Sequence, residues 1–207
     1  MRRAILAALA VTLSFAGCAN PKAANDENFT AALNAYFQSS PVCLKTGSYP
    51  MTLVDPQGND PTYAQSFSLN KAGLLSFRLT SRVVNNFFYT TRQNVYLYDL
   101  AAKAKPYWHA DSNRFCYAKM HVDRIANFTE PVASALADAM MTQVKYTYYL
   151  DDVAPWASNP YVRKYLSAIN ENLIGQRKEV EMQRLVLTNK GWQVWNEADA
   201  GNSVTAP

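Results

Sequence analysis

Segment 144–150 has the clearest strand pattern in this chain and constrains the fold more than any other feature. Valine, tyrosine and leucine side chains at every second position alternate there with Lys145, Thr147 and Tyr149. Successive side chains of a strand point to opposite faces, so this period of two predicts a sheet with one face in the core. Similar patterns, or aromatic and β-branched composition, predict further strands at 49–54, 75–79, 87–89, 95–98, 115–125, 179–187 and 192–195.

Three helices are predicted near 26–38, 61–72 and 160–174, where apolar residues recur at spacings of three and four. The second and third begin with Asp60-Pro61 and Asn159-Pro160, a capping residue followed by proline at the first helical position. Residues 131–140 would form either a short helix or a loose excursion. The resulting expectation is an α+β fold: a twisted antiparallel sheet of five to seven strands with about three helices packed on it.

The N-terminus has the pattern of a short export signal. Arg2 and Arg3 precede an uncharged run that ends at Phe15-Ala16-Gly17-Cys18. The run is well short of the roughly 20 residues that span a bilayer. This segment resembles the signal of a bacterial lipoprotein, in which the cysteine is acylated and becomes the mature N-terminus. The alternative is an ordinary secretory signal that is cleaved nearby and leaves a free cysteine.

The lipoprotein resemblance implies a division of the chain and a location. Residues 1–17 would be the signal peptide, Cys18 would carry acyl chains such as palmitate, and residues 18–27 would form a polar tether. A single domain would follow over residues 28–196, with a disordered tail at 197–207. Ala19 after the cysteine implies the outer membrane, with the protein facing the periplasm.

The rest of the chain is similar to small uncharacterised lipoproteins of Gram-negative bacteria. The similarity rests on Phe115-Cys116-Tyr117, on Ala154-Pro155-Trp156-Ala157, and on the closing Leu185-Val186-Leu187-Thr188 with Gly191-Trp192. It implies a family and an envelope location, and it implies no activity.

Once Cys18 carries lipid, Cys43 and Cys116 remain as an even pair in an oxidising compartment, where disulfides form and persist. A disulfide between them would tie the N-terminal helical part to the central sheet. The alternatives are two buried thiols or a metal pair. No second ligand stands close in sequence to either cysteine, which disfavours the metal.

Motifs for catalysis, metal binding or cofactor binding are not recognisable in the sequence, so no catalytic residue, metal or cofactor is assigned. His109 and His121 are the only histidines, and neither has the spacing of a metal-binding pair. His121 and Asp123 fall on one face of a predicted strand, where they could act as an acid–base pair. The alternative is that they belong to the wet face of a sheet.

Charge and aromatic content suggest the class of partner. Because Arg2 and Arg3 leave with the signal, the formal net charge falls from +4 to +2, which gives no reason to expect nucleic acid. Thirteen tyrosines and four tryptophans either fill the core or form a recognition surface, for which Tyr149, Trp156 and Trp195 are the candidates.

We therefore expect a non-catalytic binding or adaptor module of the periplasm, held to the membrane by its lipid and bound to an envelope protein or ligand. The alternatives are an envelope enzyme centred on His121 and Asp123, and a carrier of a small apolar ligand with a pocket between sheet and helices.

Overall fold

Two antiparallel sheets of unequal size form the framework of the computed structural model, which describes residues 20–85, 87–134, 138–177 and 180–196. The larger sheet has the strand order β1-β6-β8-β9-β10, with β5 paired to β6 and β7 paired to β8. Its strands are β1 (Val42–Lys45), β5 (Trp108–His109), β6 (Arg114–Phe128), β7 (Val132–Ser134), β8 (Ala139–Asp151), β9 (Glu181–Thr188) and β10 (Gly191–Val194). The smaller sheet has the order β2-β4-β3, with β2 (Met51–Val54), β3 (Leu75–Asn85) and β4 (Thr90–Leu100).

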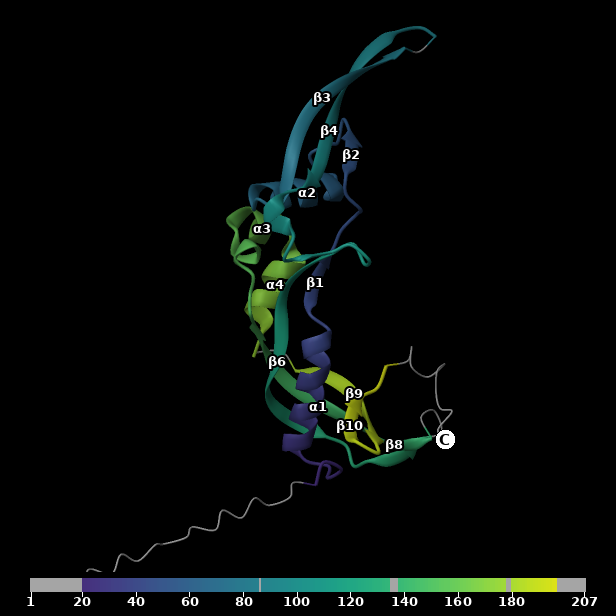
Figure 1. Ribbon diagram of the computed structural model, residues 1–207, viewed down its shortest axis with the longest axis vertical. Helices are drawn as coiled ribbons and strands as arrows, with labels where there is room; N and C mark the ends of the chain where they lie inside the picture. The colour runs from purple at the N-terminus through teal and green to yellow at the C-terminus, as the bar shows by residue number, and fades with distance from the viewer. Residues whose placement is uncertain (1–19, 86, 135–137, 178–179, 197–207) are drawn as a thin grey trace, which may run out of the picture.

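The larger sheet curls around helix α1 (Asp26–Ser39), as Figure 1 shows. The pairing register of β6 with β8 shifts at two places in β6, between Val122 and Arg124 and between Ile125 and Asn127. Such bulges bend a strand and increase its twist. The amide of Val122, at the first bulge, donates to the Asn34 side chain of α1 at 2.9 Å. The helix therefore supplies a hydrogen-bond partner where the ladder is irregular.

Helices also cover the face of β6 that carries Tyr117. The short helices η2 (Pro155–Ser158), α3 (Pro160–Tyr165) and α4 (Ser167–Gly175) follow β8. By the period of two, Tyr117 shares a strand face with His121, but it is only 3% exposed. Its ring meets the Trp156 ring edge-on at 5.8 Å, and its hydroxyl accepts a hydrogen bond from Asn172. Both faces of β6 are therefore buried over part of the strand.

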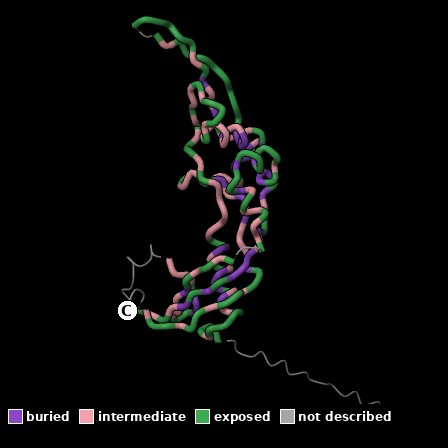
Figure 2. The backbone as a smooth tube through the Cα atoms, turned by 180° about the vertical axis from the view of Figure 1, so that it is seen from behind, coloured by how far each residue is buried: buried purple, intermediate pink, exposed green. Residues whose placement is uncertain are grey.

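The smaller sheet continues into a projecting hairpin, which we call the arm (residues 75–100). At its base, Tyr96 of β4 packs against Tyr63 of α2 (Pro61–Lys71) at 5.6 Å. Beyond α2 and the four residues of β2, the arm consists of β3 and β4 alone (Figure 1) and is mostly exposed (Figure 2). Its register runs from Leu75 opposite Leu100 to Asn85 opposite Thr90.

A disulfide joins Cys43 of β1 to Cys116 of β6, as the sequence predicted. The two cysteines are also cross-strand neighbours, because β1 pairs with β6 in the larger sheet. The disulfide lies at the point where the chain leaves the larger sheet and returns to it. Between the cysteines the chain builds α2, the smaller sheet and the short helix η1 (Ala102–Ala104).

The α+β class and the antiparallel arrangement agree with the sequence-based expectation, and several elements differ in detail. The predicted single helix 160–174 is divided at Leu166, whose backbone angles (φ −116°, ψ 77°) are not helical. Residues 87–89, predicted as a strand, lie in the loop at the tip of the arm. The 131–140 region contains β7 and the start of β8, where a helix or an excursion was expected. The signal 1–17, Cys18 and the tail 197–207 lie outside the described residues.

Buried tyrosines make the fold sensitive to alkali. Burial first, and then the neighbouring Tyr63, Tyr96 and Tyr49, together raise the pKa of Tyr98 to about 12. An acid with a raised folded pKa stabilises the fold fully below its unfolded pKa, about 10, and this contribution is lost as the pH rises through the folded value. We expect the free energy of unfolding to fall from about pH 10 to 12, and to fall less in Tyr98→Phe.

Denaturant unfolding across this pH range measures the effect. Tyr89→Phe is the matched control, because Tyr89 is 60% exposed in the folded protein, whereas Tyr98 is 2% exposed. Identical pH dependence in Tyr98→Phe and Tyr89→Phe would contradict the expectation.

Candidate functional site

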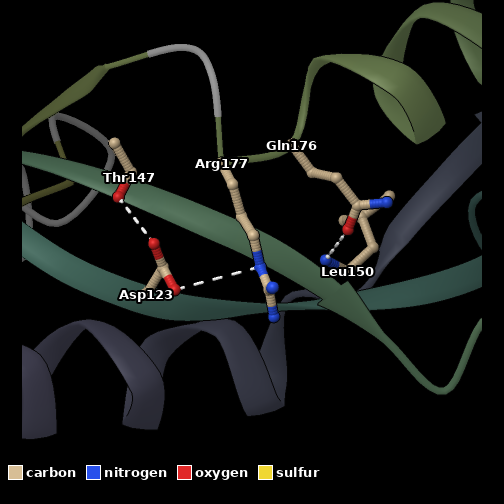
Figure 3. A network of polar contacts seen from close by, with 5 residues as sticks. All are labelled: Asp123, Thr147, Leu150, Gln176 and Arg177. Atoms are coloured by element: carbon tan, nitrogen blue, oxygen red, sulfur yellow. Dashed lines mark hydrogen bonds and ion pairs between the residues drawn. The ribbon is translucent and has the colours of Figure 1, made fainter.

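The structure places His121 and Asp123 on β6 beside residues of β8 and of the turn after α4 (Figure 3 shows part of this cluster). His121 stands opposite Tyr149 of β8, and the two rings are 5.1 Å apart. The Arg177 guanidinium lies over the same tyrosine ring at 4.9 Å. Asp123 accepts a hydrogen bond from the Thr147 hydroxyl at 3.3 Å and pairs with Arg177 at 3.9 Å.

These contacts do not form an acid–base pair between His121 and Asp123. Among the described residues, the polar contacts of the Asp123 carboxylate are with Thr147 and Arg177, and His121 contacts the Tyr149 ring. A general base needs to be within hydrogen-bond reach of the group that orients it or of the proton it takes. The geometry is that of a partly exposed polar cluster that joins β6, β8 and the turn at 176–177.

The same turn covers the edge of β8 beyond its pairing with β9. The amide of Leu150 donates to the Gln176 side chain at 2.7 Å (Figure 3), and the amide of Arg177 donates to the carbonyl of Tyr148 at 2.6 Å. Arg177 has φ +65°, which turns the chain back onto the strand. The cluster at Asp123 therefore helps to hold this turn against the sheet.

The three aromatic residues expected to form one binding surface lie apart in the structure. Tyr149 is on β8, Trp156 in η2 and Trp195 after β10, and no ring contact among the described residues joins any two of them. Tyr149 and Trp195 are half-buried. The expectation for Trp156 is wrong: it is 2% exposed and meets the rings of Tyr107, Phe115 and Tyr117. Its burial follows from η2 folding over β6.

Residues 20–25, predicted to belong to a tether, pack against the domain. The Asn28 side chain donates to the carbonyls of Asn20 and Ala23, both at 2.8 Å. The Trp192 indole donates to the Ala23 carbonyl at 3.1 Å. Helix α1 then begins at Asp26. The position of the chain is therefore fixed from Asn20 onward, at the end of the molecule formed by the start of α1 and by β10.

Gly191 allows this close approach of the N-terminal segment. It has φ +111°, and a Cβ there would lie 2.8 Å from the carbonyl oxygen of Pro21. We expect Gly191→Ala to lower the free energy of unfolding by about 1–2 kcal/mol or more, because an alanine strains this backbone conformation. It should also displace the segment and speed tryptic cleavage after Lys22.

Limited proteolysis and denaturant unfolding test this together. Gly58→Ala is the matched control, since a Cβ at Gly58 meets no atom within 4 Å. The expectation fails if Gly191→Ala is as stable and as resistant at Lys22 as Gly58→Ala.

The most exposed aromatic side chains among the described residues lie at the tip of the arm. Phe88 is 93% exposed, Phe87 is fully exposed and Tyr89 is 60% exposed. An apolar stripe continues from the tip along β3 through Val83, Leu79 and Phe77, each exposed by 44–57%. Exposed apolar patches of this kind mark interaction sites in soluble proteins.

Sequence reasoning missed the tip because Phe87-Phe88-Tyr89 has strand composition when considered by itself. Asn85-Asn86 does indicate a turn in the sequence, but residues 87–89 were assigned to the strand after that turn and not to the loop itself. The arm also carries the exposed Arg78, Arg82 and Arg92, and Arg82 donates to the Gln93 side chain at 3.0 Å. The first acidic residue on β4 is Asp99, at the base.

Hollows on the described surface are open and partly polar. One of about 660 Å³ lies between β7, β8 and β9 and is lined in part by Glu130, Thr142, Gln143 and Arg184. Within the described ranges, no group of three or more His, Cys, Asp or Glu side chains is placed to hold a metal ion. In the same residues, no helix has the length and apolar character needed to cross a membrane.

Comparison of the chain with protein-family models, with curated proteins and with solved structures finds no match.

Proposed function

We propose that this protein is a lipid-anchored, non-catalytic binding module of the bacterial envelope, and that the arm is its binding element. The observation that carries the proposal is the position of the exposed aromatic tip. It lies at the far end of the molecule from Asn20, where the described N-terminal segment begins (Figure 1).

The N-terminal segment determines how an anchored domain would stand. Asn20 is only two residues after Cys18, and two residues span at most about 7 Å even when extended. Because Asn20 and Ala23 are bonded to Asn28, a lipid on Cys18 would hold the start of α1 close to the membrane. The arm would then point away from that membrane. This geometry suits an adaptor that reaches a second envelope component.

Two further features support an exported binding protein. The Cys43–Cys116 disulfide suits an oxidising compartment such as the periplasm. Aromatic side chains are enriched where proteins bind one another. The three exposed aromatic side chains at the tip offer apolar surface that a partner would bury. Ala19, the residue after the cysteine, favours an anchor in the outer membrane.

Removing the acylated sulfur tests the anchor. In Cys18→Ser we expect the protein to leave the outer-membrane fraction, because acyl chains that each bury many CH₂ groups at about 0.8 kcal/mol apiece hold it there. Fractionation of cells expressing each form, with mass spectrometry of the mature N-terminus, measures this. A native N-terminus that begins elsewhere, or carries no acyl chain, would refute the lipoprotein assignment.

Replacing the tip aromatics tests the binding element. We expect Phe87→Ser/Phe88→Ser/Tyr89→Ser to remove the partner recovered by chemical crosslinking in whole cells, while the thermal midpoint stays near the native value because these side chains make few contacts with the core. Val180→Ser/Met182→Ser is the control, since these are also exposed apolar side chains, by 54% and 55%, but lie outside the arm. Undiminished recovery of the partner with the tip variant would exclude the tip as the binding element.

A further inference from the structure

Strand β3 presents an unpaired edge beyond its first residue, Leu75, whose carbonyl accepts a hydrogen bond from the Asn70 side chain at 2.7 Å. It is the terminal strand of the smaller sheet, and its eleven residues pair only with β4. In the ranges that the structure describes, no other backbone hydrogen bond reaches residues 76–85. An unpaired row of N–H and C=O groups is a template for pairing with another strand.

The outward groups of this edge can be assigned from the opposite strand. Asn94 of β4 directs both backbone groups away from β3, because its amide donates to the Asp55 carboxylate and its carbonyl accepts from the Asp55 amide. Residues directly opposite in an antiparallel ladder share the same kind of pair. Ser81, opposite Asn94, therefore directs its own N–H and C=O outward. By the period of two, Leu79 and Val83 do the same.

In the part of the chain that the structure describes, the other strand edges are short or covered. Strands β1, β2 and β10 have four residues each, and β7 and β5 are shorter still. The edge of β8 beyond Tyr146 is covered by Gln176 and Arg177. Short edges and covering loops are ordinary protections against unwanted pairing, as are proline, lysine and bulges within an edge strand. Strand β3 has no proline or lysine, and its register with β4 shows no shift.

The side chains of β3 indicate the chemistry of the missing strand. One face carries the exposed apolar residues Phe77, Leu79 and Val83, and the other carries Arg78 and Arg82. From Ser76 to Tyr98 the arm has no acidic residue. A neighbouring strand would satisfy both faces if apolar side chains alternated with acidic ones.

We propose that β3 binds an extended segment of another envelope protein by strand addition, and that this segment alternates apolar residues with acidic residues that pair with Arg78 and Arg82. The proposal rests on the proposed function and gives the partner of the arm its chemical character. Main-chain hydrogen bonds supply affinity in this mode, and the alternating side chains supply specificity.

A second copy of this chain fits the edge less well. Full-length antiparallel pairing of two β3 strands is centred on Thr80 and places Arg78 of one copy directly opposite Arg82 of the other. Like charges directly opposite each other destabilise a strand pair. A partner strand with carboxylates at these two positions converts the repulsion into attraction.

Defined peptides test the proposal on the full-length protein in detergent micelles. The probe is a fluorescein-labelled peptide of sequence Thr-Val-Glu-Val-Thr-Val-Glu-Val-Thr, whose two glutamates have the spacing of Arg78 and Arg82. The comparison peptide has lysine in place of both glutamates. We expect the glutamate peptide to bind about tenfold or more tightly at low salt, because both cross-strand charge pairs change sign.

Two sets of variants locate the binding. Ser81→Pro removes an outward N–H, and it should weaken binding by about tenfold or more, while the matched control Ser81→Ala binds as the native protein does. Arg78→Glu/Arg82→Glu keeps every backbone group and should reverse the preference in favour of the lysine peptide. This second variant decides the matter even if proline disturbs the arm.

Several results would overturn the proposal of strand addition. Equal binding of both peptides, no binding of either, or unchanged binding by both variant sets overturns the proposal. A concentration-dependent dimer in sedimentation that Ser81→Pro abolishes would assign the edge to a second copy and also overturn it. The peptide assay needs neither the lipid nor the envelope. Peptide binding by a protein that proves not to be anchored would therefore refute the proposed function and leave strand addition standing.

Discussion

The curl of the β6–β8 ladder is the constraint on which the rest of the structure depends. Two bulges in β6 bend the sheet enough for helix α1 to contact both β6 and β10, which are separated by β8 and β9 in the strand order. Phe29 of α1 shows the result, since its ring lies 4.9 Å from that of Phe128 on β6 and 5.2 Å from that of Trp192 on β10. A flat sheet of the same strands would leave these rings too far apart for one side chain to join them.

The curled sheet also carries the arm. The chain leaves the sheet after β1 and returns through β5 and β6, so α2, the smaller sheet and the arm form an insertion between two neighbouring strands. The Cys43–Cys116 disulfide and the hydrogen bond from the Thr46 amide to the Asn113 carbonyl close the base of this insertion. A load applied at the tip would therefore reach the larger sheet through a covalently closed pair of strands.

Sequence patterns predicted the elements whose signals are local and missed those that depend on the rest of the fold. Helices α2 and α3 begin after capping side chains, Asp60 and Asn159, that were recognised in the sequence together with the proline that follows each. Strand β1 has only four residues, too few to show a period of two in the sequence. It is a strand because it pairs with β6. Trp156 could not be assigned to the core without knowing that η2 folds over Phe115. Parts of both strands of the arm were predicted, at 75–79 and 95–98, but the loop at its tip was missed because it contains residues typical of strands.

The aromatic tip and the uncovered edge of β3 make different contributions to binding by the arm, as the free energies of burial and association show. Burying three aromatic side chains of about 150–250 Å² each at about 25 cal/mol per Å² yields on the order of 10–20 kcal/mol as an upper bound. Association costs about 4–15 kcal/mol in lost translational and rotational freedom, before any ordering of side chains. These two ranges overlap, so burial of the tip alone does not ensure a net affinity, and it gives no directional preference. Backbone pairing along β3 and charge pairing at Arg78 and Arg82 add the direction, register and selectivity that three aromatic rings cannot supply.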